Sequence, residues 1–497
     1  MSFDLAQLNS YREGNRLEAK KAKGGLPDSI WETYSSFANT NGGVILLGVD
    51  EKADGSLTSI KLDDPEKLVK QFWDNANNPQ KVSANILADK DVSIVEAMGN
   101  RIIRINVPRA DRHDKPVYVG PDPFKGSYRR NGEGDYHCIR TEVANMYRDQ
   151  SDDSMDRRIV ENMNPDVFDY ETIKRYRTRL DSEREDHVWK ELPHEDFLLR
   201  IGALGHDDDG VLHPTVAGLL MFGQAWRITH EFGNYFLDYQ ENDGTNDRWT
   251  DRFISSSGDW SGNLYDFYRR VINRLSQVVK VPFKLDASAT RIDETPVHKA
   301  LREALANALI NMSPYDTQGL VVRNWPGIIT IENPGAFRIP LETAMHGGRS
   351  DPRNTTLFTM FNLVGVGERA GSGIPNIFRV WADQNWERPV YSEEFNPDRT
   401  ILKLPMKMPS ASNLVENLVE NLVETLSKKQ AEVVAIIADR PDISTREIGE
   451  RIGITQQAAA ERIRTLTKKG VLRRVGPDKG GYWEIIGGGS HSDNEKP

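Results

Sequence analysis

The residues best suited to contact a polyanion lie near the C-terminus. Residues 425–485 hold 12 Lys and Arg against 8 Asp and Glu, although the whole chain carries a net charge of −10. Because phosphate contacts require concentrated Lys and Arg, an acidic protein can bind nucleic acid only through a local basic surface. The cations expected to supply these contacts are Arg464, Lys468, Lys469, Arg473, Arg474 and Lys479. Gln456 and Gln457 precede them and carry amides that can read base edges.

Three helices and a hairpin are expected to position these residues. Residues 428–438 have helical periodicity, and a Ser-Thr-Arg-Glu capping box at Ser444 starts a second helix that ends at Gly453. A third helix runs over 455–469 and is followed by two β-like runs in 471–486. The expected core face of the third helix consists of Ala459, Ile463 and Leu466. This order predicts a winged helix-turn-helix that binds DNA, and the alternative is a winged helix used only for protein contacts.

Length and composition bound the remaining possibilities. A chain of 497 residues is too long for one core, and 38% apolar with 28% charged residues is typical of globular proteins. No apolar run approaches the roughly 20 residues needed to span a bilayer, and the first residues lack the apolar core of a signal peptide. The single cysteine, Cys138, cannot form an internal disulfide. We therefore expect a cytoplasmic protein with no membrane contact.

The pattern of elements predicts a multi-domain α/β (α+β) protein. Strands are expected at 44–49 and 101–107, and a helix around 26–38. A second α/β region holds a helix over 297–311 and strands at 320–324 and 328–332. The expected domains are 1–150, a connecting region 151–290, a second α/β domain 291–408, a linker helix 409–427, the winged helix 428–487 and a disordered tail 488–497.

The N-terminal region resembles the Schlafen AlbA-like domain, a family of nucleic-acid-associated α/β modules. The resemblance covers about residues 1–145 and rests on Glu13, Glu18–Lys20, Leu26-Pro27, Phe37–Gly43 with the following VILLGVDE, Lys115–Tyr118 and Ser127–Arg130. It implies binding of DNA or RNA. The residues expected to contact phosphate are Arg12, Arg16, Lys20, Lys21, Lys23, Arg129 and Arg130. The alternative is a solvated surface of salt-linked side chains.

The same resemblance raises the alternative of a nuclease. In Schlafen relatives that cut RNA, three carboxylates bind metal, and Glu13 and Glu18 fall at the first two positions. Glu51, beside Asp50, occupies the third. Such oxygen ligands suit Mg²⁺ or Mn²⁺ and phosphodiester hydrolysis. The competing interpretation is an ordinary acidic surface on a DNA-binding domain.

The second α/β region resembles a divergent GHKL-type, histidine-kinase-like ATP-binding domain, whose relatives often carry a helicase label. The resemblance rests on REALANALIN at 302–311, ENPGAF at 332–337, SDPRN at 350–354 and GERAGSGI at 367–374. It implies that Glu303 polarises the attacking water and that Asn307 binds the Mg²⁺ of ATP. The i,i+4 spacing places both on one helix face.

Other motifs of this resemblance concern the rest of the nucleotide. Gly367, Gly371 and Gly373 would close over the phosphates with backbone N–H donors. Asn333 and Gly335 stand where relatives have an aspartate-glycine turn that reads adenine, and here the aspartate is absent. ATP hydrolysis, ATP binding as a switch and a scaffold role remain alternatives.

Together these features predict a transcription-regulator-like DNA-binding protein coupled to an ATP-binding domain. The competing class is an enzyme, either a metal-dependent nuclease or an ATPase of nucleic-acid defence or repair. The repeat NLVENLVENLVE at 413–424 places Leu414, Leu418 and Leu422 on one stripe that must be buried. We expect burial in a homodimer or higher oligomer, and the alternative is packing on its own chain.

Overall fold

A computed structural model shows two compact units, one formed chiefly by residues 4–384 with 388–406 and the other chiefly by residues from Lys407 onward. The residues described are 8–9, 11–244, 249–278, 284–285, 291–292, 295–367, 371–395, 397–407, 428–440, 443–468, 471–475 and 482–485. The repeat at 413–424, the tail, Lys469, Lys479 and part of GERAGSGI lie outside these residues. The mixed α/β, multi-domain class is confirmed.

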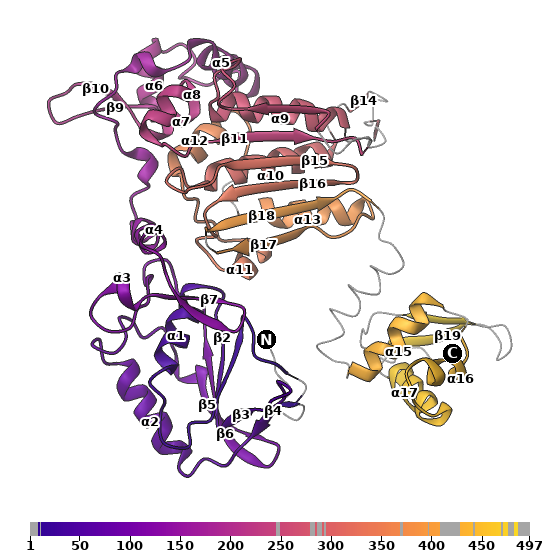
Figure 1. Ribbon diagram of the computed structural model, residues 1–497. Helices are drawn as coiled ribbons and strands as arrows, with labels where there is room; N and C mark the ends of the chain where they lie inside the picture. The colour runs from indigo at the N-terminus through magenta and orange to yellow at the C-terminus, as the bar shows by residue number, and fades with distance from the viewer. Residues whose placement is uncertain are drawn as a thin grey trace. The chain divides into compact units, whose positions relative to one another are not determined.

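The N-terminal domain is a four-stranded sheet with helices packed against it (Figure 1). Its elements are β1 (Leu17–Lys20), α1 (Ile30–Asn39), β2 (Gly43–Leu47), β3 (Val49–Glu51), β4 (Leu57–Ser59), α2 (Pro65–Ala76), β5 (Val92–Ala97), β6 (Asn100–Val107), α3 (Pro123–Gly126), β7 (Tyr128–Asn131), β8 (Gly134–His137) and α4 (Arg140–Gln150). The sheet order is β1-β2-β6-β5, with β1 and β2 parallel.

Local sequence explains several of these boundaries. The expected strand 44–49 is divided into β2 and β3 because Gly48 has a φ of +87°, a conformation that glycine adopts readily. Asp64 caps α2 by accepting the Lys67 backbone N–H at 2.9 Å. A core of apolar side chains, including Trp31, Phe37 and Phe72, fills the space between the helices and the sheet.

A mainly helical region follows. It contains α5 (Tyr170–Glu183), α6 (His194–Arg200), β9 (Leu204–His206), β10 (Leu212–Pro214), α7 (Val216–Phe222) and α8 (Ala225–Glu231). Every residue of α7 is buried, and Thr215 caps the helix by accepting the Gly218 N–H at 3.0 Å. A Cβ on Gly218 would lie 2.1 Å from the Ala203 carbonyl oxygen, so close backbone packing requires glycine there.

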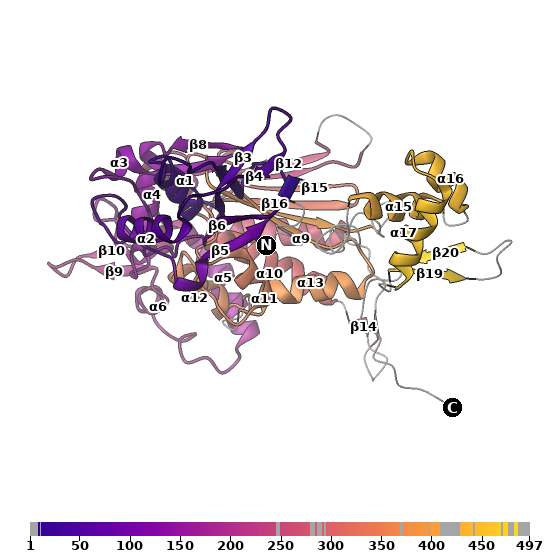
Figure 2. The same cartoon turned by 90° about the horizontal axis from the view of Figure 1, so that it is seen from below.

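The central domain is built on a six-stranded sheet of order β12-β11-β15-β16-β18-β17. Its elements are β11 (Leu237–Glu241), β12 (Asp251–Ile254), α9 (Leu264–Val278), β13 (Lys284–Leu285), β14 (Arg291–Ile292), α10 (Pro296–Asn311), β15 (Leu320–Trp325), β16 (Ile328–Pro334), α11 (Leu341–His346), α12 (Thr355–Leu363), α13 (Gly373–Asp383), β17 (Val390–Glu394) and β18 (Arg399–Pro405). Figure 2 shows α9, α10 and α13 together on one side of this sheet, as a two-layer α/β arrangement requires.

The sheet crosses the domain boundary that the sequence led us to expect. Strand β11 pairs in parallel with β15, so that Tyr239 lies opposite Val322. Strand β12 extends the sheet from β11. A boundary at residue 291 therefore cuts through one continuous sheet, because the pairing of β11 with β15 joins segments about 80 residues apart and leaves no local sequence signal.

The C-terminal unit has the predicted order of three helices and a hairpin. Its elements are α15 (Lys428–Asp439), α16 (Thr445–Arg451), α17 (Gln456–Lys468), β19 (Leu472–Val475) and β20 (Tyr482–Ile485). The capping box is present, since Glu447 N–H donates to Ser444 Oγ at 3.3 Å and Ser444 N–H donates to Glu447 Oε2 at 3.0 Å. The predicted core face of α17 is buried, which confirms the pattern of the third helix.

No helix within the described residues is long and apolar enough to cross a bilayer.

Candidate nucleotide pocket and nucleic-acid interface

Helix α10 contributes three polar residues, Glu303, Asn307 and Asn311, to a pocket of the central domain. It begins at Pro296, after the cap residue Thr295, and buries its apolar side chains against the sheet and neighbouring helices. Glu303 and Asn307, one turn apart, both line a pocket that encloses about 950 Å³, part of it open to solvent. The Asn307 amide donates from Nδ2 to Glu303 Oε1 at 3.2 Å. The side-chain oxygen of Asn307 is therefore the atom left to serve as a ligand.

The N-terminus of α13 lies directly against Glu303. A Cβ built on Gly373 would be 2.2 Å from Glu303 Oε1, so only glycine fits the observed position of the carboxylate. The first turn of a helix has unpaired backbone N–H groups and attracts negative charge. Gly371, which has a φ of +62°, also lines the pocket. The acid of α10 and the start of α13 thus form one polar wall.

The opposite wall comes from the sheet and from the segment after β16. Asn333 is buried and lines the pocket, as do Thr400 and Tyr391 from β18 and β17. Thr400 Oγ1 donates to the Gly335 carbonyl at 2.9 Å and fixes the turn after β16. Burial raises the pKa of Tyr391, with the Glu303 carboxylate contributing, so the phenol stays neutral and remains a donor.

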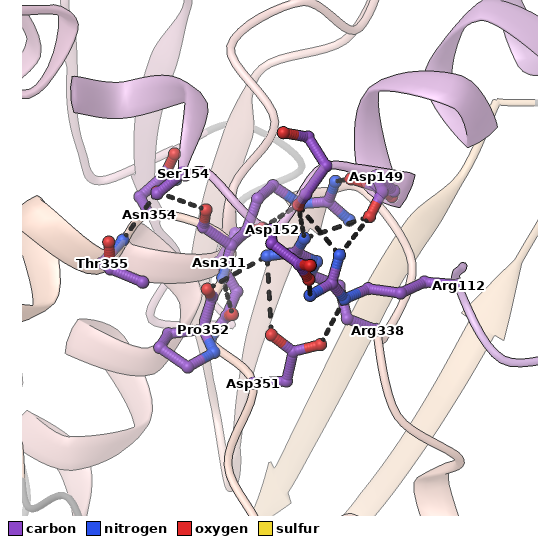
Figure 3. A network of polar contacts seen from close by, with 12 residues as sticks. Arg112, Asp149, Asp152, Ser154, Asn311, Arg338, Asp351, Pro352, Asn354 and Thr355 are labelled. Carbon is purple, nitrogen blue, oxygen red and sulfur yellow. Dashed lines mark hydrogen bonds and ion pairs between the residues drawn. The ribbon is translucent and has the colours of Figure 1, made fainter. Parts of the chain in front are cut away.

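A cluster of arginines and aspartates, here called the rim, adjoins this pocket through Arg338 and Asp351, which line it (Figure 3). Asp351, which lines the pocket, accepts a hydrogen bond from Arg112 Nε at 2.8 Å and lies 3.6 Å from Arg338 Nη1. Arg338 also donates to the Asp149 carbonyl at 3.1 Å. Arg353 pairs with the Asp149 carboxylate. Because Arg112 follows β6 and Asp149 lies in α4, the rim joins the pocket to the N-terminal domain.

The arginines of the rim are anchored by backbone as well as by charge. Arg112 Nη1 donates to the carbonyls of Asp149 at 2.7 Å and Ser151 at 2.9 Å. Arg353 Nε donates to the Asn311 carbonyl at 3.1 Å, at the end of α10. Charge-assisted hydrogen bonds of this kind are stronger than neutral ones. The end of α10, the rim and the end of α4 are consequently linked.

Helix α17 of the C-terminal unit presents polar side chains on the face opposite its buried side chains. Gln456 and Gln457 are exposed at its first turn, and Arg464 and Lys468 are exposed further along. On the hairpin, Arg473 is exposed, and the Arg474 guanidinium lies 4.9 Å from the centre of the Trp483 ring. This order of helices and strands is typical of a winged helix-turn-helix.

Family comparisons agree with this geometry. Residues 13–139 match the model described as "Schlafen, AlbA_2", and residues 321–401 match "Putative ATP-dependent DNA helicase recG C-terminal". Residues 426–473 match "Winged helix-turn-helix DNA-binding". The chain carries a Schlafen AlbA_2 domain, a recG C-terminal-type domain and a winged helix-turn-helix. Residues 144–238 match a domain of unknown function, DUF8451.

Two solved structures are similar to the chain. The DIP2311 protein from Corynebacterium diphtheriae is 18% identical, with 95% of this chain and 92% of that chain covered and a TM-score of 0.40. The N-terminal domain of a RecG-related protein from Nitrosomonas europaea is 30% identical, with 27% of this chain and 90% of that chain covered and a TM-score of 0.22. No curated protein matches the chain.

The three acids of the expected metal site, Glu13, Glu18 and Glu51, lie near one another in the Schlafen AlbA_2 domain. Within the described residues, no group of three His, Cys, Asp or Glu side chains could hold a metal ion. Glu13 accepts the Ala19 backbone N–H at 2.8 Å, and burial raises its pKa, with the charges of Glu18 and Glu51 adding to the shift. Asp50 pairs with Lys21 at 2.9 Å. Both oxygens of Glu18 bind Lys20 and Arg130, and one oxygen each of Glu13 and Asp50 has a protein partner.

Two of the expected phosphate contacts are instead internal ion pairs. Arg130 is buried and binds Glu18 and Asp135, at 2.8 and 2.9 Å. Arg129 lies 3.2 Å from Glu142, and both side chains are nearly inaccessible. The phosphates of a nucleic acid backbone cannot reach the Arg130 guanidinium, and Arg129 offers them little surface. This corrects the expectation for Arg129 and Arg130.

The other basic candidates of the domain differ in accessibility. Lys20 is paired with Glu18 at 2.8 Å and is mostly covered, whereas Lys21 and Lys23 are exposed. Arg16 is half-buried, and its Nε is a buried atom without a hydrogen-bond partner in the described part of the chain. Exposed cations near the start of the sheet therefore remain available for nucleic acid.

Sequence reasoning found part of the nucleotide pocket and missed its rim. Glu303, Asn307, Asn333, Gly371 and Gly373 line one pocket, whereas Gly335 and Gly367 are not among its described lining residues. Gly335 has a φ of +99° and faces the Arg353 guanidinium, so it serves the turn. Asp351 and Arg353 belong to SDPRN, one of the motifs on which the resemblance rests, but the sequence suggested no role for it. The two charged residues of this motif were the signal that could have indicated the rim.

Proposed function

We propose that this protein is a transcription-regulator-like DNA-binding protein whose DNA affinity responds to a nucleotide in the recG C-terminal-type domain. The winged helix would select the DNA, with Gln456 and Gln457 at base edges and Arg464, Lys468, Arg473 and Arg474 at phosphates. The Schlafen AlbA_2 domain would add a second nucleic-acid contact.

The pocket suits ATP with Mg²⁺. Asn307 would coordinate the metal through its free amide oxygen, which is a hard oxygen ligand of the kind Mg²⁺ prefers. The bound Mg²⁺ would neutralise phosphate charge. The backbone N–H groups at the start of α13 would receive phosphate oxygens, and the Glu303 carboxylate is placed to accept a proton from water. Asn333, in place of the aspartate of relatives, would offer adenine an amide acceptor.

One observation carries the coupling: Asp351 lines the pocket and also binds Arg112 of the Schlafen AlbA_2 domain. A ligand that contacts Asp351 or Arg338 would change the electrostatic environment of Arg112. It would thereby change the ion pairs that join the N-terminal domain to the central domain. A ligand shifts such an equilibrium only by its differential affinity for the two arrangements. Allosteric couplings of about 1–3 kcal/mol correspond to about 5- to 150-fold changes in affinity.

The test measures DNA affinity with and without nucleotide. A duplex selected from a random library would be titrated by fluorescence anisotropy, with and without a non-hydrolysable ATP analogue and Mg²⁺. We expect the analogue to change wild-type affinity by about fivefold or more. Asn307→Ala should lose nucleotide binding and the response together. Asp351→Asn should keep nucleotide binding, measured by calorimetry, but lose the response.

Asp383→Asn is the matched control. Asp383 is exposed at the end of α13, and its substitution removes the same charge from the same domain. Nucleotide heat without any change in wild-type DNA affinity would contradict the coupling. Absence of heat at millimolar nucleotide would leave the domain as a scaffold.

We further propose that two chains associate, because winged helices commonly read paired half-sites. The repeat at 413–424 would contribute a stripe of leucines, with the larger domains supplying the remaining surface. Within the described residues no group of three acids could hold a metal ion, so the acids of the Schlafen AlbA_2 domain do not carry a proposal of nuclease activity.

A further inference from the structure

A second cavity lies between the Schlafen AlbA_2 domain and the central domain. It spans about 620 Å³, part of it open to solvent, and is lined on one side by Arg109, Arg112, Lys115 and Arg129 and on the other by Arg338, Phe395 and Asp398, among others. It shares Ala336, Phe337 and Arg338 with the nucleotide pocket but none of the polar residues of α10. It is therefore a separate space with its own chemistry.

Positive charge dominates the cavity lining. Five cations, Arg109, Arg112, Lys115, Arg129 and Arg338, face three acids, Glu142, Asp149 and Asp398. Three of the arginines have carboxylate partners of their own: Arg109 binds Glu393, Arg112 binds Asp351, and Arg129 lies beside Glu142. These pairs form a polar wall that is already neutralised. Of the charged lining residues, Lys115 and Asp398 have no such ion pair in the described part of the chain.

Lys115 is an enclosed ammonium with a single acceptor. Its Nζ donates to the Asn39 carbonyl at 2.8 Å, and it has no ion pair within 4 Å among the described residues. An ammonium has three N–H donors, so two are left for something in the cavity. Burial lowers the pKa of Lys115, and the nearby Arg109 charge lowers it further. An enclosed charge with incomplete hydrogen bonding costs folding free energy.

Asp398 faces the same cavity without touching Lys115. No hydrogen bond to its carboxylate is present in the described part of the chain, and burial raises its pKa, with the Asp316 charge contributing. Near neutral pH its carboxyl can therefore carry a proton and donate. Arg338 also lines the cavity and adds a positive charge to it, although its side chain is nearly inaccessible and its Nη atoms already donate to backbone carbonyls.

We propose that this cavity binds a small phosphate-class oxyanion, held by Lys115 as the principal donor, with Asp398 completing its hydrogen bonds and Arg338 adding positive charge to the lining. A tetrahedral oxyanion offers several acceptors to donors that converge from different directions, and it supplies the negative charge that the lining lacks. Its binding would connect the two domains through groups that the protein itself leaves unpaired. The site shares Arg338 with the nucleotide pocket, but it does not require a bound nucleotide and does not rest on the proposed function.

The test is calorimetry of the full chain with inorganic phosphate at neutral pH. We expect saturable binding that Lys115→Met weakens at least tenfold. Lys125→Met is the control, because Lys125 lies in the same domain with its side chain 85% exposed. Asn307→Ala should bind phosphate like the wild type, which separates this cavity from the nucleotide pocket. A second titration uses AMP, a phosphate monoester, in place of inorganic phosphate. It shows whether the cavity takes a free anion or the phosphate group of a nucleotide.

A second measurement keeps the proposal testable if Lys115→Met does not fold. Sulfate does not titrate near neutral pH, so proton uptake during its binding, measured in buffers of different ionisation heat, reports the protein's own groups. We expect uptake in the wild type and an altered uptake in Asp398→Asn. Absence of binding heat at phosphate concentrations up to about 10 mM, or equal binding by folded Lys115→Met, would overturn the proposal.

Discussion

Removing Arg464 and Lys468 together takes two exposed positive charges from the face of α17 that points away from its core. If each contacts one DNA phosphate, their loss releases fewer counterions on binding. Each phosphate contact contributes about 0.9 to the slope of log affinity against log salt, so the double variant Arg464→Ala with Lys468→Ala should lower the slope by about 1.8. Between 50 and 200 mM salt, the wild type should then lose about 12-fold more affinity than the variant.

Fluorescence anisotropy over a salt series measures both quantities. The matched control is Lys174→Ala with Arg179→Ala, which removes two exposed charges from α5 and should leave the slope unchanged. Circular dichroism should show that α17 is retained, because neither substitution touches the buried Ala459, Ile463 or Leu466. An unchanged affinity and slope in the double variant would show that the winged helix does not read the DNA.

Three further outcomes are expected. Gly373→Ala should weaken nucleotide binding by about tenfold or more, since its Cβ displaces the Glu303 carboxylate. Gly233→Ala is the control, because a Cβ there meets no atom within 4 Å. Equal calorimetric affinities of the two variants for the nucleotide would contradict the steric argument. Burial lowers the pKa of Lys115 to about 7, so the folded state holds this proton less tightly than the unfolded chain. The melting temperature of the wild type should therefore rise with pH between about 7 and 10. Lys115→Met should flatten this rise, and an identical pH profile in the variant would refute the argument. Deleting 413–424 should lower the mass measured by light scattering, and an unchanged oligomer would exclude the repeat as its interface.

Features set by local sequence were predictable. The capping box at Ser444 and the apolar stripe of α17 were correctly predicted because they depend on residues a few positions apart. Helix α10 begins one residue before its expected start and ends where expected, at Asn311. The single strand expected at 44–49 was wrong because the positive φ of Gly48 breaks it, although an isolated glycine in a strand is a known sign of such a break.

Features set by distant contacts were not predictable. Arg130 looks like a surface cation in the sequence, but Glu18, more than 100 positions away, draws it into the interior. The rim formed by Arg112, Asp351 and Asp149 joins segments separated by as many as 239 positions. Charge type can be read from one sequence, whereas burial and pairing depend on the assembled fold.

The parallel pairing of β11 with β15 has a consequence for any attempt to isolate the nucleotide domain. A fragment that starts at residue 291 lacks β11 and β12, so the backbone of Leu320–Trp325 would become a free strand edge. Unpaired N–H and C=O groups along an edge recruit strands from other chains. Such a fragment should aggregate, and one that begins before β11 should remain dispersed.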